Sequence, residues 1–321
     1  MFKLRIYAIM VGILISQTTW SSTTNKFSEI IVFGDSLSDS GNFASLNGPL
    51  PSPPFFNNRI SNGLTSVDLL AQSLNLTVDA SLHLVGPISG TNFAVVGART
   101  GSASPLDLFT QINEFLSNSG GIADPDALYV VSIGGNDVRD ARDTFSLVDA
   151  VNVVETAVNS QLAQIERLIL SGARNLLIVN VADIGSIPET RLISNALGMN
   201  NFQVRASNLS RYYNDILTNE LDSIEDELSI NFLLVNQFNI LNQFIRDANN
   251  LGFENTTQAC FSTTTLTFSD ACIFGTRFDQ FIFFDEIHPT ARVNQLFAQH
   301  LVTQTRKLIN YEDSNDDKDD D

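Results

Sequence analysis

Four short apolar runs, separated by long intervening stretches, constrain the fold of this chain more than any other feature. They lie at 29–33, 127–133, 175–181 and 230–235. Each run is nearly continuous in apolar residues instead of alternating between apolar and polar ones. A strand of this kind must be covered on both faces, which is typical of parallel sheets flanked by helices. The pattern therefore predicts parallel strands in the interior of the protein.

Helical periodicity fills the gaps between the last three runs. Apolar residues recur there at spacings of three and four, which predicts two amphipathic helices. The first carries Val151, Val154, Val158, Ile165 and Leu168, and the second Leu209, Tyr212, Tyr213, Ile216, Leu217, Leu221, Ile224 and Leu228. Strands that alternate with helices predict an α/β fold with three α/β/α layers and a central parallel sheet. No repeat or linker divides the chain, so we expect a single domain over 23–311. The stretches 47–62, 183–201 and 249–280 look irregular and are expected to form functional rims or lids.

Both ends of the chain differ from its middle. Lys3 and Arg5 precede a mostly apolar run at 6–15 and a small, polar stretch at 16–22. This order predicts a signal peptide over 1–22, with an uncleaved anchor as the alternative. The protein is then expected to be secreted, or periplasmic in a Gram-negative host. The segment 312–321 holds seven acids and one Lys, which predicts a disordered acidic tail.

The net charge excludes one class of partner. The chain carries −18 overall, and −12 remains when the −6 of the acidic tail is left out. Nucleic-acid binding needs clustered Lys and Arg, so we expect no nucleic acid. The only cysteines are Cys260 and Cys272. In an exported chain such a pair usually forms a disulfide, with two free thiols as the alternative. Histidines at ligand spacing are lacking nearby, so we expect no metal there.

Ser36 follows the first apolar run, in the sequence Gly-Asp-Ser-Leu at 34–37. A residue at this place lies at the carboxyl end of a strand, where open parallel sheets bind ligands. The alternative is an ordinary turn or helix N-cap, since Ser after Gly is common there.

Two further segments could supply hydrogen-bond donors. Gly97 ends the sequence Asn-Phe-Ala-Val-Val-Gly at 92–97, where a glycine could present its N–H to a substrate or simply form a bulge. Asn136 lies in Gly-Gly-Asn-Asp at 134–137, directly after the second run. Its amide could donate to an oxyanion, or it could only shape a turn.

One histidine of the three stands out. His288 follows Asp285 by three residues and precedes a proline, whereas His300 fits a helix face and His83 lies between two leucines. A carboxylate can fix the imidazole tautomer so that the ring accepts a proton from a serine. Glu286 is a competing carboxylate, but its spacing to His288 favours an orientation away from the ring.

These four segments, taken in this order, resemble the GDSL (SGNH) hydrolase family from Ile30 to about Leu308. The resemblance implies a flavodoxin-like fold. It also implies that Ser36 is the nucleophile, His288 the base and Asp285 its partner. The oxyanion hole would comprise the N–H groups of Ser36 and Gly97 and the side chain of Asn136. No phosphate-binding or dinucleotide motif is present, so we expect no cofactor.

The Ser-Asp-Ser-Gly-Asn sequence at 38–42 resembles the lipolytic branch, with its lysophospholipases, phospholipases and glycerophospholipid–cholesterol acyltransferases. A lipid ester is therefore the first hypothesis for the substrate, and it would imply transient contact with a membrane or micelle surface. An esterase for short-chain or carbohydrate esters is the second hypothesis. A non-catalytic secreted binding protein is the third, and the intact set of motif residues argues against it. No protein partner is implied.

Overall fold

The computed structural model describes residues 26–316, except 229 and 231. The predicted signal peptide, 1–22, lies outside the described residues, as does the end of the acidic tail, 317–321. Among the described helices, none is long and apolar enough to cross a membrane.

A four-stranded parallel sheet forms the centre of the fold, in the order β1-β2-β3-β4. Its strands span Ile30–Gly34, Leu128–Ser132, Asn175–Val179 and Phe232–Val235, in chain order. The strands β2, β3 and β4 lie within their predicted apolar runs. The strand β1 is shifted by one residue toward the C-terminus relative to its run, 29–33. The segment 91–95 adds a further position beside β1, because Val32 and Asn92 form a parallel bridge and the Phe93 N–H donates to the Val32 carbonyl. When this segment is counted as the second strand in chain order, the five strands lie in the spatial order 2-1-3-4-5. This is the flavodoxin-like order that the resemblance implies.

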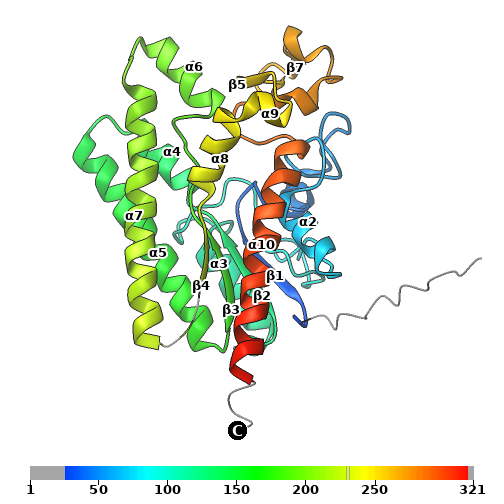
Figure 1. Ribbon diagram of the computed structural model, residues 1–321, viewed down its shortest axis with the longest axis vertical. Helices are drawn as coiled ribbons and strands as arrows, with labels where there is room; N and C mark the ends of the chain where they lie inside the picture. Colours follow the sequence, from blue (N-terminus) through cyan, green and yellow to red (C-terminus); the bar gives the residue numbers. More distant parts are fainter. Residues whose placement is uncertain (1–25, 229, 231, 317–321) are drawn as a thin grey trace, which may run out of the picture.

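Helices cover both faces of the sheet, so the predicted three-layer α/β/α architecture is confirmed (Figure 1). One face is covered by α3 (Leu108–Asn118), α5 (Leu147–Leu170) and α7 (Phe202–Leu228). The other is covered by α2 (Ser66–Ser73) and α10 (Ala291–Asp316), which pack against each other. The remaining helices are α1 (Asn42–Asn47), α4 (Gly135–Asp143), α6 (Pro188–Leu197), α8 (Gln237–Arg246) and α9 (Ala248–Leu251).

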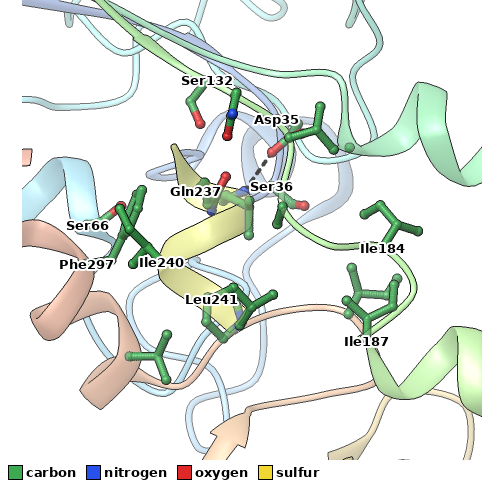
Figure 2. A pocket seen from close by; sticks show the side chains of 18 of the residues that line it. Asp35, Ser36, Ser66, Ser132, Ile184, Ile187, Gln237, Ile240, Leu241 and Phe297 are labelled. Carbon is green, nitrogen blue, oxygen red and sulfur yellow. Dashed lines mark hydrogen bonds between the residues drawn. The ribbon is translucent and has the colours of Figure 1, made fainter. Parts of the chain in front are cut away.

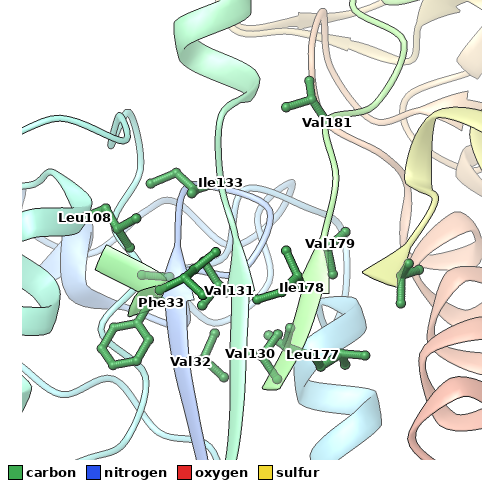
Figure 3. Close-up of a cluster of buried hydrophobic side chains, with 14 of the residues drawn as sticks. Val32, Phe33, Leu108, Val130, Val131, Ile133, Leu177, Ile178, Val179 and Val181 are labelled. Atoms are coloured by element: carbon green, nitrogen blue, oxygen red, sulfur yellow. The ribbon is translucent and has the colours of Figure 1, made fainter. Parts of the chain in front are cut away.

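Most residues of the two predicted apolar stripes face the sheet. Of the others, Ile216 packs half-buried against the core, and Val151 is half-buried outside it. On α5, the side chains of Val154, Val158, Ile165 and Leu168 are fully buried. On α7, Leu209, Tyr213, Leu217, Leu221 and Ile224 are buried, whereas Tyr212 and Leu228 are exposed. Tyr212 lies one residue off the buried stripe and donates its hydroxyl to Glu155 on α5. The strands and the buried faces of these helices form one continuous core, part of which Figure 3 shows.

Two of the three stretches expected to be irregular contain regular structure. The stretch 183–201 holds α6, which begins with Pro188 at a position where a proline favours helix initiation. The stretch 249–280 holds α9, the strands β5 (Asn255–Ala259), β6 (Phe261–Ser262) and β7 (Thr267–Phe268), and short 3₁₀ helices at Asp270–Cys272 and Phe278–Gln280. It leads into β8 (Phe281–Phe283), which pairs with β5. At the other end, α10 continues to Asp316, five residues into the segment predicted to be a disordered tail.

Candidate active site

The carboxyl ends of the sheet strands meet along one edge of the molecule, and a pocket opens there. Its walls include Ser36 after β1, Asn136 after β2, Asn180 after β3 and Gln237 after β4. Figure 2 shows Asp35 and Ser36 at this edge, with side chains from α8 and α10 facing them. The structure thus brings together segments that lie about 250 residues apart in the chain, as expected for ligand sites in open parallel sheets.

The backbone before Ser36 is held from several sides. A side chain at Gly34 would place its Cβ 2.4 Å from the Ser132 carbonyl oxygen of β2, so only glycine fits between the two strands. The Gln111 side chain accepts from the Gly34 N–H at 2.9 Å and donates to its carbonyl at 2.8 Å. Ser36 therefore follows a strand end whose position is fixed on both sides.

Other polar residues of the two N-terminal motifs form a scaffold beneath the site. The Asp39 carboxylate accepts from four backbone N–H groups, including that of Val96 at 3.0 Å. The Asn42 amide donates to the carbonyls of Asn92 and Ala94, and Asn92 donates back to the Ser38 carbonyl. These buried hydrogen bonds tie the segment that bears Ser36 to the one that bears Gly97.

Asp285 and His288 lie on a tight loop between β8 and Pro289. The Phe284 N–H donates to the His288 carbonyl at 2.8 Å, which closes the loop. Asp285 Oδ1 accepts from the N–H groups of Ile287 and His288, at 2.8 and 2.7 Å. The spacing of three residues in the sequence thus places the carboxylate directly beside the imidazole.

Ser36, His288 and Asp285 form a continuous chain of hydrogen bonds. Ser36 Oγ lies 2.7 Å from His288 Nε2, and His288 Nδ1 lies 2.8 Å from Asp285 Oδ2. All three side chains are buried. Because the carboxylate can only accept, it favours the tautomer with the proton on Nδ1, and Nε2 is then free to accept from the serine hydroxyl. This is the arrangement in which a histidine can remove a proton from serine.

The predicted oxyanion donors lie on neighbouring segments. Asn136 lines the pocket, and its Nδ2 donates to the Ala98 carbonyl at 2.9 Å. Gly97 adjoins that contact without lining the pocket itself, and its φ of 83° lies in the left-handed region that favours glycine. Among the residues that the structure describes, the N–H groups of Ser36 and Gly97 have no hydrogen-bond acceptor. They are therefore available to a ligand.

Burial changes the electrostatics around Ser36. It raises the pKa of Asp35 to about 6, although the Leu37 N–H and positive charge at His288 and Arg139 act in the opposite direction. It also raises the pKa of Asp137 to about 7, against the lowering effect of hydrogen bonds from Thr100. These shifts indicate a poorly solvated site, where directed hydrogen bonds act more strongly than in water.

Beyond its polar edge the pocket is lined by apolar side chains. It holds about 980 Å³ of space, its open mouth included. Aliphatic and aromatic side chains from the loop after β3, from α8 and from α10 form its walls, namely Val181, Ile184, Ile187, Ile240, Leu241, Phe244, Val293 and Phe297. Helix α8 was not predicted from the sequence, although Asn236 caps it and Phe238, Leu241 and Phe244 recur at helical spacing.

The other residues considered from the sequence lie apart from this site. The Glu286 carboxylate faces away from the ring, as expected, and accepts from the N–H and hydroxyl of Thr263. His83 contacts Ser81, and His300 lies on α10 against Phe244. Among residues 26–316, apart from 229 and 231, no cluster of three or more metal-ligating side chains is found.

The predicted disulfide is confirmed and supports the loop that carries Asp285 and His288. Cys260 and Cys272 are bonded, and both are fully buried. The N–H groups of Cys260 and Phe261 donate to the carbonyls of Phe283 and Phe284, immediately before Asp285. The disulfide-closed segment thus packs directly against the strand that carries the loop.

Comparison with known proteins relates the chain to one family. The model of the GDSL-like lipase/acylhydrolase family matches residues 30–301. A GDSL esterase/lipase of Arabidopsis thaliana is 28% identical over 318 residues, covering 84% of this chain and 85% of that protein. The phosphatidylcholine-sterol acyltransferase of Aeromonas hydrophila is 27% identical over 266 residues, covering 79% of this chain and 72% of that protein. A solved acetylxylan esterase of Geobacillus stearothermophilus is 12% identical with a TM-score of 0.41, covering 87% of this chain and 94% of that one. Since the family model spans most of the chain, the protein belongs to the GDSL-like lipase/acylhydrolase family and is a serine ester hydrolase.

Proposed function

We propose that this protein cleaves lipid carboxylic esters through an acyl-enzyme formed on Ser36, with the acyl chain in the apolar pocket. The observation that carries the lipid assignment is the position of that pocket. Ser36 lies at its polar edge, and Leu241 and Phe244 of α8 line its apolar part. An acyl chain bound there would be removed from water, and burial of each methylene contributes about 0.8 kcal/mol.

The chemistry follows from the hydrogen-bond chain. Ser36 Oγ attacks the ester carbonyl carbon while His288 Nε2 takes the hydroxyl proton, and Asp285 stabilises the imidazolium that forms. The negative charge on the carbonyl oxygen is stabilised by the Ser36 and Gly97 N–H groups and the Asn136 amide. His288 then returns the proton to the leaving alcohol. Water, activated by the same histidine, releases the acid and restores Ser36.

An alcohol in place of water would give acyl transfer at the same site. The Aeromonas hydrophila relative is named an acyltransferase, so both outcomes fit one acyl-enzyme. The balance between them depends on which acceptor reaches the acyl-enzyme, and hydrolysis needs only water.

A chain-length series of p-nitrophenyl esters, used below their aggregation limits, tests the lipid assignment. We expect kcat/KM to rise at least about tenfold from the acetyl to the octanoyl ester, because six more methylenes enter the pocket. Leu241 is buried at the pocket wall. The variant Leu241→Trp should abolish this rise, because the larger side chain fills the pocket. Turnover of the acetyl ester should remain within about threefold, since a short chain does not need that space.

A matched variant separates pocket filling from a general disturbance of α8. Gln243 is an exposed residue of the same helix and does not line the pocket. Gln243→Trp should therefore retain the octanoyl preference. A wild-type protein that prefers the acetyl ester, and whose profile Leu241→Trp leaves unchanged, would contradict the lipid assignment and favour the short-chain hypothesis.

We also propose that the protein acts outside the cytoplasm. The signal-peptide pattern at 1–22 and the Cys260–Cys272 disulfide both support an oxidising, exported location. The intact mass of protein recovered from an exporting host should show a chain cleaved near Ser21 or Ser22. An uncleaved chain retained with the membranes would contradict this proposal.

A further inference from the structure

The Asn136 amide is held in one orientation by two neighbours of different chemistry. Its Nδ2 donates to the Ala98 carbonyl, and its Oδ1 accepts from Arg139 Nη1, both at 2.9 Å. A carbonyl can only accept and a guanidinium can only donate, so a flipped amide would lose both hydrogen bonds. The observed orientation leaves the second Nδ2 proton without an acceptor among the described residues.

Arg139 is itself clamped. Its Nε and Nη2 donate to the two carboxylate oxygens of Glu189 on α6, at 2.8 and 2.5 Å. Such a two-point contact fixes the plane of the guanidinium as well as its position. All three kinds of nitrogen in Arg139 are therefore engaged, two by Glu189 and one by Asn136.

Glu189 is anchored by a buried second arginine. Arg142 is only 1% exposed, and its Nη1 donates to Glu189 Oε2 and to the Thr190 hydroxyl, both at 2.8 Å. Burial raises the pKa of Glu189, but the two arginines outweigh that effect and hold it below its usual range. Glu189 is thus ionised at neutral pH.

The same residue also contacts the loop that bears the acid–base pair. The Glu189 N–H donates to the Glu286 carbonyl at 2.8 Å, one residue after Asp285. The series Asn136, Arg139, Glu189 therefore connects the proposed oxyanion donor to the catalytic loop through direct hydrogen bonds.

We propose that Arg139, clamped by Glu189, is a positioning residue that holds the Asn136 amide with its N–H groups toward the oxyanion. This inference rests on the proposed function, since it assumes that Asn136 donates to the oxyanion. Without Arg139 the amide can rotate and present its oxygen to the developing negative charge. Such a rotamer repels the transition state and leaves substrate binding largely unchanged.

The test is a double-mutant cycle with Arg139→Met, which keeps an unbranched apolar stem and removes every donor. We expect kcat per active site to fall about ten- to hundredfold, with KM changed less than about threefold. The fall should not exceed the effect of removing one oxyanion donor outright. In the Asn136→Ala background the same change should lower kcat less than about twofold, because no amide remains to be oriented. Glu189→Gln should shift kcat in the same direction by a smaller factor.

Active sites are counted by complete reaction with a fluorophosphonate, so that partial unfolding does not count as slow turnover. Arg139→Lys serves as a second variant that retains the charge, and we expect its kcat to lie between those of the wild type and Arg139→Met. The matched control is Arg167→Met, which breaks a similar contact, from Arg167 Nη2 to Asn113 Oδ1, away from the pocket. Its kcat should equal that of the wild type.

The outcomes separate this inference from the proposed function. Wild-type turnover in Asn136→Ala would reject the oxyanion role itself. Slow turnover in Asn136→Ala together with wild-type turnover in both Arg139 variants would reject only the positioning role. If the effects of Arg139→Met and Asn136→Ala on kcat multiply in the double variant, the positioning role is also rejected. Arg139 would then act on the substrate or the fold independently of Asn136.

Discussion

Ser36→Ala should lower ester turnover at least about a thousandfold while the protein remains folded. The Ser36 hydroxyl oxygen lies 2.7 Å from His288 Nε2. Without it no acyl-enzyme forms, and only the oxyanion donors and the binding pocket remain to accelerate attack by water. Steady-state kinetics on a purified variant, with its melting temperature measured on the same preparation, checks this expectation.

A serine outside the site provides the control. Ser45 donates its hydroxyl to the Asn42 carbonyl on α1 and does not contact His288. Ser45→Ala should retain turnover close to the wild-type value. Near-normal turnover in Ser36→Ala, measured free of contaminating esterase, would reject Ser36 as the nucleophile.

Asn136→Ala should lower kcat about 10²–10³-fold with little change in KM. The loss of one preorganised side-chain donor to an oxyanion usually has this cost. The amide matters mainly in the transition state, so ground-state binding changes little. The structure favours this role over a simple turn, because Asn136 lines the pocket and its amide is held by two partners.

The alternative role for Asn136 predicts the reverse pattern. If the residue only shapes the start of α4, its removal should lower the free energy of unfolding by about 1 kcal/mol or more and leave kcat per active site nearly intact. Asn113→Ala is the matched control, since Asn113 also accepts from an arginine but lies away from the pocket on α3. An unstable Asn136→Ala variant with wild-type turnover would remove Asn136 from the site.

The strands and the residues of the hydrogen-bond chain could be predicted from the sequence because both depend on local patterns. Continuous apolar runs mark buried parallel strands, and the strand ends bring the motifs to one edge. The spacing between Asp285 and His288 fits one tight loop, so their contact is also local. Within this hydrogen-bond chain, the contact between His288 and Ser36 joins residues far apart in the sequence. It was expected only from the resemblance to the family.

The Arg139–Glu189 contact could not be predicted in this way. The two residues are 50 positions apart, and Glu189 lies in a stretch that looked irregular but forms the first turn of α6. Nothing in the spacing of a single arginine or glutamate indicates such a partner. The walls of the apolar pocket could not be predicted for a similar reason, because they come from α8, α10 and the loop after β3, which meet only in the folded protein.

The motifs also carry residues whose function is structural. Asp39, Asn42 and Asn92 are fully buried, and each hydrogen-bonds a backbone group of the other motif segment. A sequence pattern cannot distinguish such residues from catalytic ones, since both are polar and follow a strand. The structure separates them by location, because Ser36 and Asn136 line the pocket and Asp39, Asn42 and Asn92 do not.

Covalent labelling of Ser36 tests the central claim most directly. The wild-type protein, treated with a fluorophosphonate and digested, should carry one phosphonyl adduct, and fragment masses should place it on Ser36. Replacing His288, for example as His288→Ala, should slow the labelling strongly, because no base removes the hydroxyl proton. A folded protein that stays unlabelled, or an adduct on a different serine, would contradict the proposed acyl-enzyme mechanism.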